Sequence, residues 1–459
     1  MNLTSWRCKI WIFAAVLILA PVALRAARAT EAESREPLRL NLQEAVELGL
    51  ERNPRIQAME FAVERSRSEV KSVRGRLLPR LTAGFSETYV ENIDATGPSD
   101  EDYINQMQES WRVSLQQPLY AGKTLINGYR KARLQEQATR LEKETEERKV
   151  IRQIQEEFLQ LLKAREDRRS LEQTVERLRV AHEAMEAFVA QRMAPYVDVL
   201  QARVELEDAL QQLSQARNAE VIYKIRLDGL LGFGEGDVVS YVGTLADIEL
   251  QRKFDLAQCQ QTAADQRIEL KRIQANIQMA EKEKQIAAGQ TLPRVTLQMN
   301  AIDYSRDYDE PALNIFGQPY DRDQQNQYWT AGVTVEWNFF SGGEHYYRGQ
   351  SMENEIRRLE RLYDDTAATI QTEVQSAYLR LQEARQREET TRLSLRTAEE
   401  AYRMEKKRLE MRVGTIQALI DAQDALTRAD ANLNKAMRDY QLALADLYYA
   451  MGTRSYALN

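Results

Sequence analysis

The sequence predicts an α+β membrane protein built from two copies of one unit, in which short strands connect to very long helices. Three features of the 459 residues support this class: an internal duplication, segments of alternating apolar and polar residues, and helix-spaced apolar residues sustained far beyond an ordinary helix length. Repetition on this scale is typical of stacked or ring-like architectures.

The duplication is clearest where strand signals meet helical ones. The run 77–80 returns at 291–294 with an offset of 214, whereas 119–122 returns at 339–342 with an offset of 220. Six extra residues therefore lie between the two strand signals of the second copy. We expect four segments: a signal peptide at 1–29, a first repeat at 30–231, a linker at 232–258 and a second repeat at 259–459.

The N-terminus has the pattern of a secretory signal peptide. Arg7 and Lys9 precede an apolar run at 10–24, and the Ala-Arg-Ala at 27–29 fits a cleavage site. The run is shorter than the roughly 20 residues that a membrane helix needs, although an uncleaved anchor is the alternative. We expect export, and because only Cys259 remains after cleavage, no intramolecular disulfide.

Charge and motif content argue against nucleic-acid binding and catalysis. The net charge is −7, with acidic and basic residues interspersed and no basic patch. His182 and His345 lack metal-ligand spacing, and the sequence has no phosphate-binding glycine loop or nucleophile motif. We therefore expect no enzyme activity, no cofactor and no metal site.

Each repeat opens with helix-spaced residues, at 42–74 and at about 256–289, and Asn53-Pro54 breaks the first of these segments. Strand signals follow near 80–91 and 109–118, and again near 293–304 and 327–340. The clearest alternation is at 328–339. The connections at 91–109 and 304–327 are polar and rich in turn residues, so we expect loops there.

The apolar strand faces carry tryptophans that suit a membrane interface. Trp329 and Trp337 are eight residues apart, roughly 27 Å along a strand, and Trp111 lies on the apolar face of its own strand. A transmembrane β-barrel has an apolar band about 25 Å tall between aromatic girdles. The alternative is a strand of a soluble sandwich. Since about eight strands are the minimum for such a barrel, four per chain require an oligomer of at least two chains.

Helical periodicity then runs to about 192 and 411, and after short breaks return helices run to about 230 and 450. Seventy helical residues would reach roughly 105 Å, longer than any compact core, so these helices should pack on one another as coiled coils.

This plan resembles the TolC family of outer-membrane efflux proteins, over essentially all of the mature chain. The resemblance rests on the duplicated order of elements, on the strand-to-helix corners at 117–122 and 338–343, and on the motif Asp198-Val199-Leu200-Gln201-Ala202-Arg203 with its second copy at 418–423. In the second copy, Ala418 stands where the family has an additional aspartate, and the turn glycine Gly414 lies closer to the motif than is common.

The resemblance implies a homotrimer in outer-membrane lipid. Three chains would form a twelve-stranded transmembrane β-barrel and a coiled-coil α-barrel of twelve long helices across the periplasm, with 232–258 in an equatorial belt. Such proteins are passive conduits, which work with a periplasmic adaptor protein and an inner-membrane pump. The adaptor would dock at the two turns, for which the candidate residues are Met193, Ala194, Pro195, Tyr196, Arg412, Val413, Gly414 and Thr415.

Asp198 and Asp421 are candidates for a gate at the periplasmic mouth. Threefold symmetry would gather three copies of each, and an acidic ring favours cations. The alternative is a carboxylate that stabilises a helix N-terminus.

Three functions remain open from the sequence. The first is a trimeric duct for small molecules or secreted polypeptide, two cargoes that the sequence does not separate. The second is a periplasm-spanning tether without an open lumen. The third, an exported enzyme, lacks a reactive constellation. Polar inward-facing strand residues favour the duct.

Overall fold

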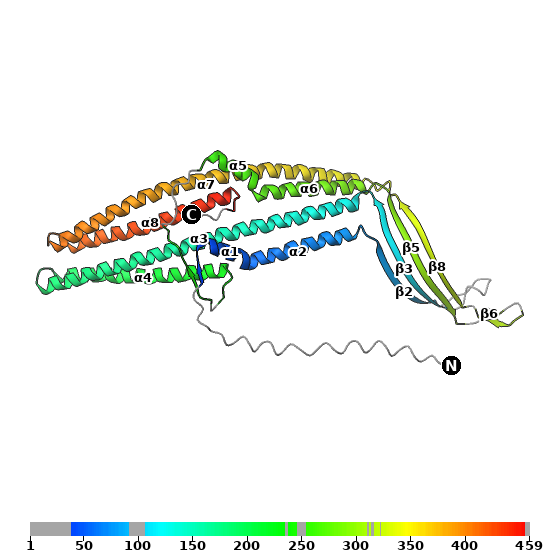
Figure 1. The fold of residues 1–459 in the computed structure, drawn as a ribbon, viewed down its shortest axis with the longest axis horizontal. Coiled ribbons are helices and arrows are strands. Elements are labelled where there is room, and N and C mark those ends of the chain that lie inside the picture. Colours follow the sequence, from blue (N-terminus) through cyan, green and yellow to red (C-terminus); the bar gives the residue numbers. More distant parts are fainter. Residues whose placement is uncertain are drawn as a thin grey trace, which may run out of the picture.

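The computed structural model describes residues 38–90, 106–234, 237–245, 254–309, 312–313, 316–321 and 323–454. The expected signal peptide at 1–29, most of the loop at 91–109 and part of the linker at 232–258 lie outside these residues. The molecule is elongated, with four long strands at one end and two helix reversals at the other (Figure 1).

The two repeats contain the same sequence of long elements. The first comprises α1 (Leu42–Arg52), α2 (Pro54–Gly75), β2 (Arg80–Val90), β3 (Gln106–Ala121), α3 (Thr124–Ala190) and α4 (Tyr196–Leu230). The second comprises α5 (Leu256–Gln266), α6 (Ile268–Gly289), β5 (Arg294–Tyr308), β8 (Gln324–Glu336), α7 (Glu344–Glu410) and α8 (Ile416–Ala450). Equivalent helices have equal lengths of 11, 22, 67 and 35 residues.

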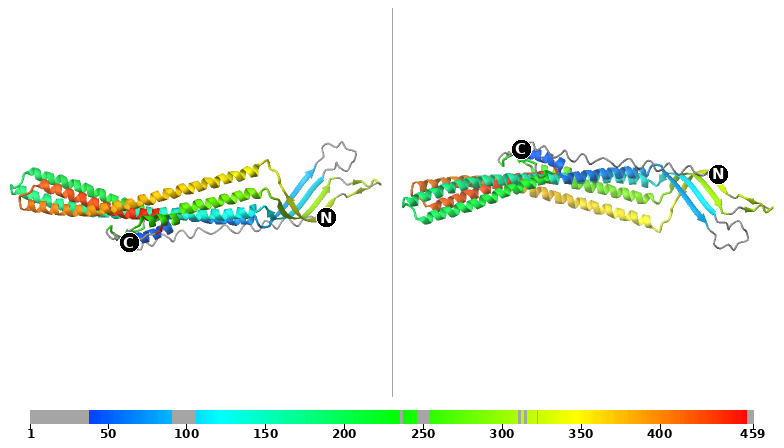
Figure 2. Two further views of the ribbon diagram at one scale, coloured as in Figure 1. Left: turned by 90° about the horizontal axis from the view of Figure 1, so that it is seen from above. Right: turned by 90° about the horizontal axis from the view of Figure 1, so that it is seen from below.

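The four long strands form one antiparallel sheet in the order β2-β3-β5-β8, so that β2 and β8 are its edges. Figure 2 shows the strands leaving the ends of the helices as one group. The short strands β1 (Leu38–Leu40) and β4 (Val239–Tyr241) pair in parallel, and β6 (Ala312–Leu313) pairs with β7 (Pro319–Tyr320).

The strand limits differ from those expected from sequence. The strand expected at 327–340 ends at Glu336, because Glu336 pairs with Arg294 and β5 has no earlier residue to offer as a partner. In the other direction β3 and β5 are longer than expected, since their pairing continues to Gln106 opposite Tyr308. The segment at 304–327, expected to be a loop, holds the end of β5, the hairpin β6–β7 and the start of β8.

The first repeat is tied together at mid-length by an apolar cluster. Phe158 and Leu162 of α3 pack with Leu227 of α4, and Tyr241 of β4 meets Phe158 edge-on with ring centroids 5.9 Å apart. Burial and a hydrogen bond to Asp228 raise the pKa of the Tyr241 phenol, which therefore stays neutral and donates this bond. The described part of the linker is thus anchored to the middle of α3.

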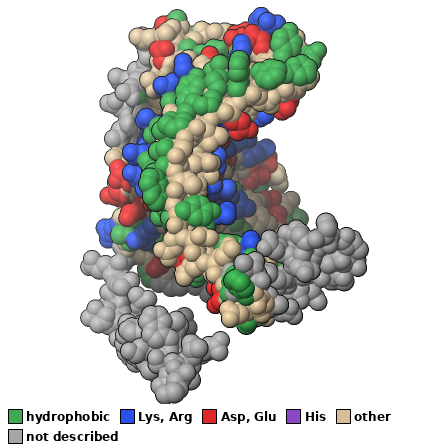
Figure 3. Space-filling view, turned by 90° about the vertical axis from the view of Figure 1, so that its right-hand side faces the viewer, with side chains coloured by type: hydrophobic (Ala, Val, Ile, Leu, Met, Phe, Trp, Pro, Cys, Tyr) green, Lys and Arg blue, Asp and Glu red, His purple; other side chains and the backbone are tan. Residues whose placement is uncertain are grey.

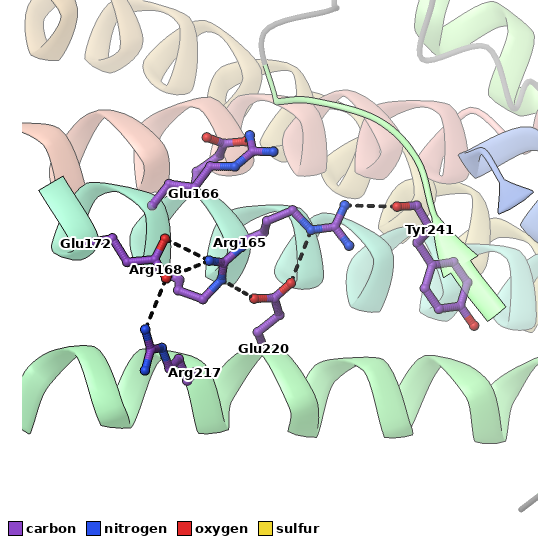
Figure 4. A network of polar contacts seen from close by, with 8 residues as sticks. Arg165, Glu166, Arg168, Glu172, Arg217, Glu220 and Tyr241 are labelled. Carbon is purple, nitrogen blue, oxygen red and sulfur yellow. Dashed lines mark hydrogen bonds and ion pairs between the residues drawn. The ribbon is translucent and has the colours of Figure 1, made fainter. Parts of the chain in front are cut away.

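A polar network continues from this cluster along α3 (Figure 4). Arg165 donates to the Tyr241 carbonyl at 2.9 Å, and Arg165 and Arg168 both donate to Glu220 of α4, at 3.2 and 2.6 Å. Glu172 accepts from Arg168 at 2.9 Å and from Arg217 at 3.3 Å, which fixes the register of α3 against α4.

The short helices are joined differently in the two repeats. Asn53 caps α2 by accepting the Arg55 N–H at 2.9 Å, and its side chain donates to the Leu230 carbonyl at 2.8 Å. Its counterpart is Arg267, which is buried and pairs with Glu269 and Glu373. The same backbone corner is therefore held by a neutral amide in one copy and by an ion-paired guanidinium in the other.

Helix α6 meets the β3–α3 corner through two glycines in backbone contact. Gly122 has a φ of 58°, and a Cβ on Gly289 would lie 2.2 Å from the Gly122 carbonyl oxygen. Neither backbone can yield as a flexible side chain would.

Gly289→Ala should therefore lower the free energy of unfolding by about 1–3 kcal/mol, measured by thermal denaturation of the full chain. The matched control is Gly128→Ala, on α3 a few residues beyond the same corner, where a Cβ meets no atom within 4 Å. Because alanine favours helix over glycine, this control should not destabilise the protein. Equal losses in both variants would contradict the backbone contact.

Candidate functional site

The two helix reversals lie together at the end of the molecule opposite the strands (Figure 1) and have the same geometry. The Met193 N–H bonds to the Phe188 carbonyl at 2.8 Å, and the Val413 N–H bonds to the Arg408 carbonyl at 2.9 Å. In each case the preceding residue also bonds back three positions, which completes a Schellman motif.

Arginines occupy the left-handed positions of these motifs, with φ of 57° at Arg192 and 63° at Arg412. The sequence suggested Gly414 as the turn glycine, but the positive φ belongs to Arg412. Gly414 is favoured for a different reason, close backbone contact, since a Cβ there would lie 3.0 Å from the Leu409 nitrogen.

A pocket of about 250 Å³ lies between the two turns. Met193, Ala194 and Pro195 line it from the first turn, and Arg412, Gly414 and Thr415 from the second. Tyr196 and Val413, by contrast, are 65 % and 67 % exposed. The structure therefore brings the two sets of turn residues predicted from sequence into one surface.

The two candidate gate residues have different surroundings. Asp198 lies in the first turn of α4 and lines the pocket between the turns. Asp421 is exposed in the second turn of α8, where it accepts a hydrogen bond from Gln417 at 2.9 Å.

Sequence reasoning missed the acidic neighbours of Asp421. Burial raises the pKa of Glu205 on α4, and the negative charges of Asp424, Asp208 and Asp421 raise it further. The spacing was a usable signal, because Glu205 and Asp208, like Asp421 and Asp424, are three residues apart and so share a helix face.

At the other end of the molecule, the sheet has one apolar and one polar face over its helix-proximal half. On the apolar face, Leu81 pairs with Leu115 and Ala83 with Val113; all of these side chains are exposed except that of Leu115, which is half-buried. The opposite face carries residues such as Thr82, which is paired with Ser114. Figure 3, drawn from the strand end, shows hydrophobic side chains gathered in a curved band.

The three tryptophans predicted for a membrane interface all have exposed side chains. Trp111 packs on Phe85 with ring centroids 4.8 Å apart, at the loop side of the apolar face. Trp329 is opposite Ala301, two positions nearer to the helices. Trp337 lies just beyond β8, and its indole N–H donates to the Thr291 carbonyl at 3.0 Å.

No helix within the described ranges combines the length and apolarity that crossing a membrane requires. In the same part of the chain, no group of three or more His, Cys, Asp or Glu side chains is placed to hold a metal ion.

The family model described as "Outer membrane efflux protein" matches residues 45–233 and 260–453, which are most of both repeats. The chain belongs to this family. The match confirms the resemblance to TolC-family channels that the motifs predicted, and its two segments agree with the internal duplication. No curated protein is significantly similar in sequence.

Solved structures of outer membrane proteins share this fold. VceC from Vibrio cholerae is 16 % identical with a TM-score of 0.72, over 90 % of this chain and 96 % of that one. The CmeC outer membrane channel of Campylobacter jejuni is 16 % identical with a TM-score of 0.74, over 90 % and 85 %. The open state of the MtrE outer membrane channel of Neisseria gonorrhoeae is 16 % identical with a TM-score of 0.71, over 90 % and 89 %.

Glu205, Asp208, Asp421 and Asp424, here called the acidic group, make the stability of the folded chain depend on pH. Because the pKa of Glu205 is higher in the folded chain than in the unfolded chain, its ionisation costs stability above the folded pKa, and the cost disappears below the unfolded pKa. Glu205→Gln should therefore raise the thermal midpoint at pH 7 and leave it nearly unchanged near pH 4. Glu207→Gln, on the same helix with an exposed side chain, is the control. A pH-independent effect of Glu205→Gln would contradict the assignment.

Proposed function

We propose that this protein is a homotrimeric outer-membrane channel, the exit duct of a tripartite efflux system or a type I secretion system. The observation that carries the proposal is the open sheet. Among the described residues no strand pairs with the outer edges of β2 and β8, and the apolar face is exposed. Lipid does not tolerate open sheet edges. Because β2 and β8 run in opposite directions, they can pair as antiparallel neighbours. Pairing β8 of one chain with β2 of the next closes a ring, and three sheets supply twelve strands.

Exposed apolar residues on the helices support the same assembly. On α4, Val204, Ile222 and Ile225 are 58 %, 49 % and 64 % exposed, and on α7 Leu379 and Leu393 are 54 % and 65 % exposed. Neighbouring copies of the long helices would cover these side chains, as in a coiled coil. In the proposed trimer α3, α4, α7 and α8 of each chain form the twelve-helix α-barrel.

The polar face of the sheet supports a duct over a tether. The apolar face is suited to lipid, which leaves Thr82, Ser114 and Asn300 on the face that would point into the barrel. A tether could fill its interior with apolar side chains, whereas polar residues suit a water-filled lumen. The duct would pass small molecules or polypeptide from an inner-membrane pump to the outside.

The surface formed by the two turns is the proposed docking point for a periplasmic adaptor. It has a pocket between the two turns, and exposed side chains at Tyr196 and Val413 beside it. A partner can bind both turns at once because they lie at one level (Figure 1).

A photo-cross-linking amino acid at Tyr196 or Val413, in intact cells, should capture an adaptor protein identified by mass spectrometry. Gly414 is unsuitable for the probe because a side chain there would meet backbone atoms. The control is a probe at Ile225, equally exposed but near the opposite end of α4, which should capture a second copy of this chain. Trimers that form without any partner at the turns would favour the tether.

The acidic group near the turns should select cations. Asp421→Asn should lower the ratio of cation to anion permeability about twofold, measured from reversal potentials of the purified channel in planar bilayers under a salt gradient. Asp365→Asn removes the same charge from an exposed position on α7, far from the turns. Equal shifts in the two variants, or none in either, would exclude a ring at Asp421.

A further inference from the structure

A second pocket, of about 620 Å³, lies where the helices meet the sheet. Its lining comes from α2, β2, β3, α3 and β5 and includes three arginines, Arg76, Arg80 and Arg294. Leu78 and Tyr120 supply apolar surface, since they are 58 % and 40 % exposed. A pocket of this size fits a small organic molecule.

The three arginines have no assigned partner among the described residues. None of their guanidinium groups forms an ion pair or a hydrogen bond there, whereas arginines along α3 pair regularly with glutamates. Glu336 of β8 is opposite Arg294 in the register, and no ion pair joins the two side chains in this part of the structure. The pocket therefore brings together three guanidinium groups that form no ion pair with the described residues.

The strand register places this charge on the polar face. Arg80 pairs with Gln116, and both alternate with Leu81 and Leu115 of the apolar face. Thr296, also in the lining, is on the same side as Arg80 because strand residues two apart share a face. The charged part of the pocket therefore lies on the face of the sheet opposite the surface suited to lipid.

Because of the internal duplication, each chain contributes two equivalent arginines to the pocket. Arg80 and Arg294 are equivalent residues of the two repeats, each the first residue of its strand after a proline. In the proposed trimer these positions would form a basic zone around the lumen at the lower end of the barrel, opposite in sign to the acidic group near the turns.

We propose that this pocket binds solutes that carry a carboxylate, sulfonate or phosphate next to an apolar group. Guanidinium groups hold such oxyanions through paired, charge-assisted hydrogen bonds, and Leu78 and Tyr120 provide contact for the apolar part. The inference rests on the proposed function for the lumenal position, and it names the class of solute that the duct would retain at this level. A lipid headgroup has the same chemistry, but it would have to reach the face of the sheet turned away from lipid.

The test uses full-length protein in nanodiscs of zwitterionic lipid and the fluorescence anisotropy of carboxyfluorescein, an aromatic anion. Wild-type protein should bind the dye, and Arg80→Gln/Arg294→Gln should weaken binding at least about tenfold. Arg112→Gln/Arg306→Gln removes the same charge from the same face outside the pocket and should change binding less than about twofold. Arg80→Lys should retain part of the affinity, because the charge remains.

Equal weakening in both double variants would overturn the pocket as the binding site, because it would mean that the overall positive charge of this face attracts the dye. Wild-type binding that falls when phosphatidylglycerol is added to the nanodiscs would assign the pocket to lipid headgroups and overturn the solute. Conductance of the same preparations in planar bilayers separates the two proposals. Conducting trimers that do not bind the dye would remove the anion site and leave the duct, whereas non-conducting chains that bind it would remove the duct and leave the site.

Discussion

The backbone N–H and C=O groups along the outer edges of β2 and β8 have no partner strand within the described part of the chain. In a single sheet of four strands these groups are exposed, and so is the apolar face beside them. An isolated chain is therefore prone to pair with other chains along these edges. Both problems end when copies of the sheet join edge to edge. The proposed ring then fixes where α3 and α7 begin, because α3 follows β3 and α7 follows β8, and the two turns join α4 and α8 to these helices.

Although the two repeats contain the same elements, they bury their long helices to different extents. Helix α4 buries few residues, whereas α8 is buried along most of its length because it packs on α3 as well as on α7. Contacts between α8 and α3 include polar ones, as at Thr174 with Thr427 and Arg152 with Asp446. The repeats therefore have equivalent backbones, but the more deeply buried long helix is α3 in the first repeat and α8 in the second.

The sequence predicted the order of the long elements and the location of both turns, because periodicity and duplication depend on local pattern. It misplaced the end of β8, since that limit depends on where β5 begins and not on the apolar residues at 337–340. It predicted Gly414 for a role that Arg412 has, because Schellman motifs tolerate a strained non-glycine residue when packing holds it. The residues of the acidic group around Glu205, and those of the arginine pocket, come from separate helices and strands. Contact between separate elements cannot be read from one amino-acid sequence.

The equal length of α3 and α7, each 67 residues, has an evolutionary consequence. Deleting one residue from either helix would retract its turn by about 1.5 Å and rotate everything beyond the deletion by about 100°. The two turns would then stand at different heights and face different directions. Insertions and deletions in these helices should therefore be fixed in matched pairs, or in steps close to whole heptads, so that descendants of this gene lengthen or shorten both halves together.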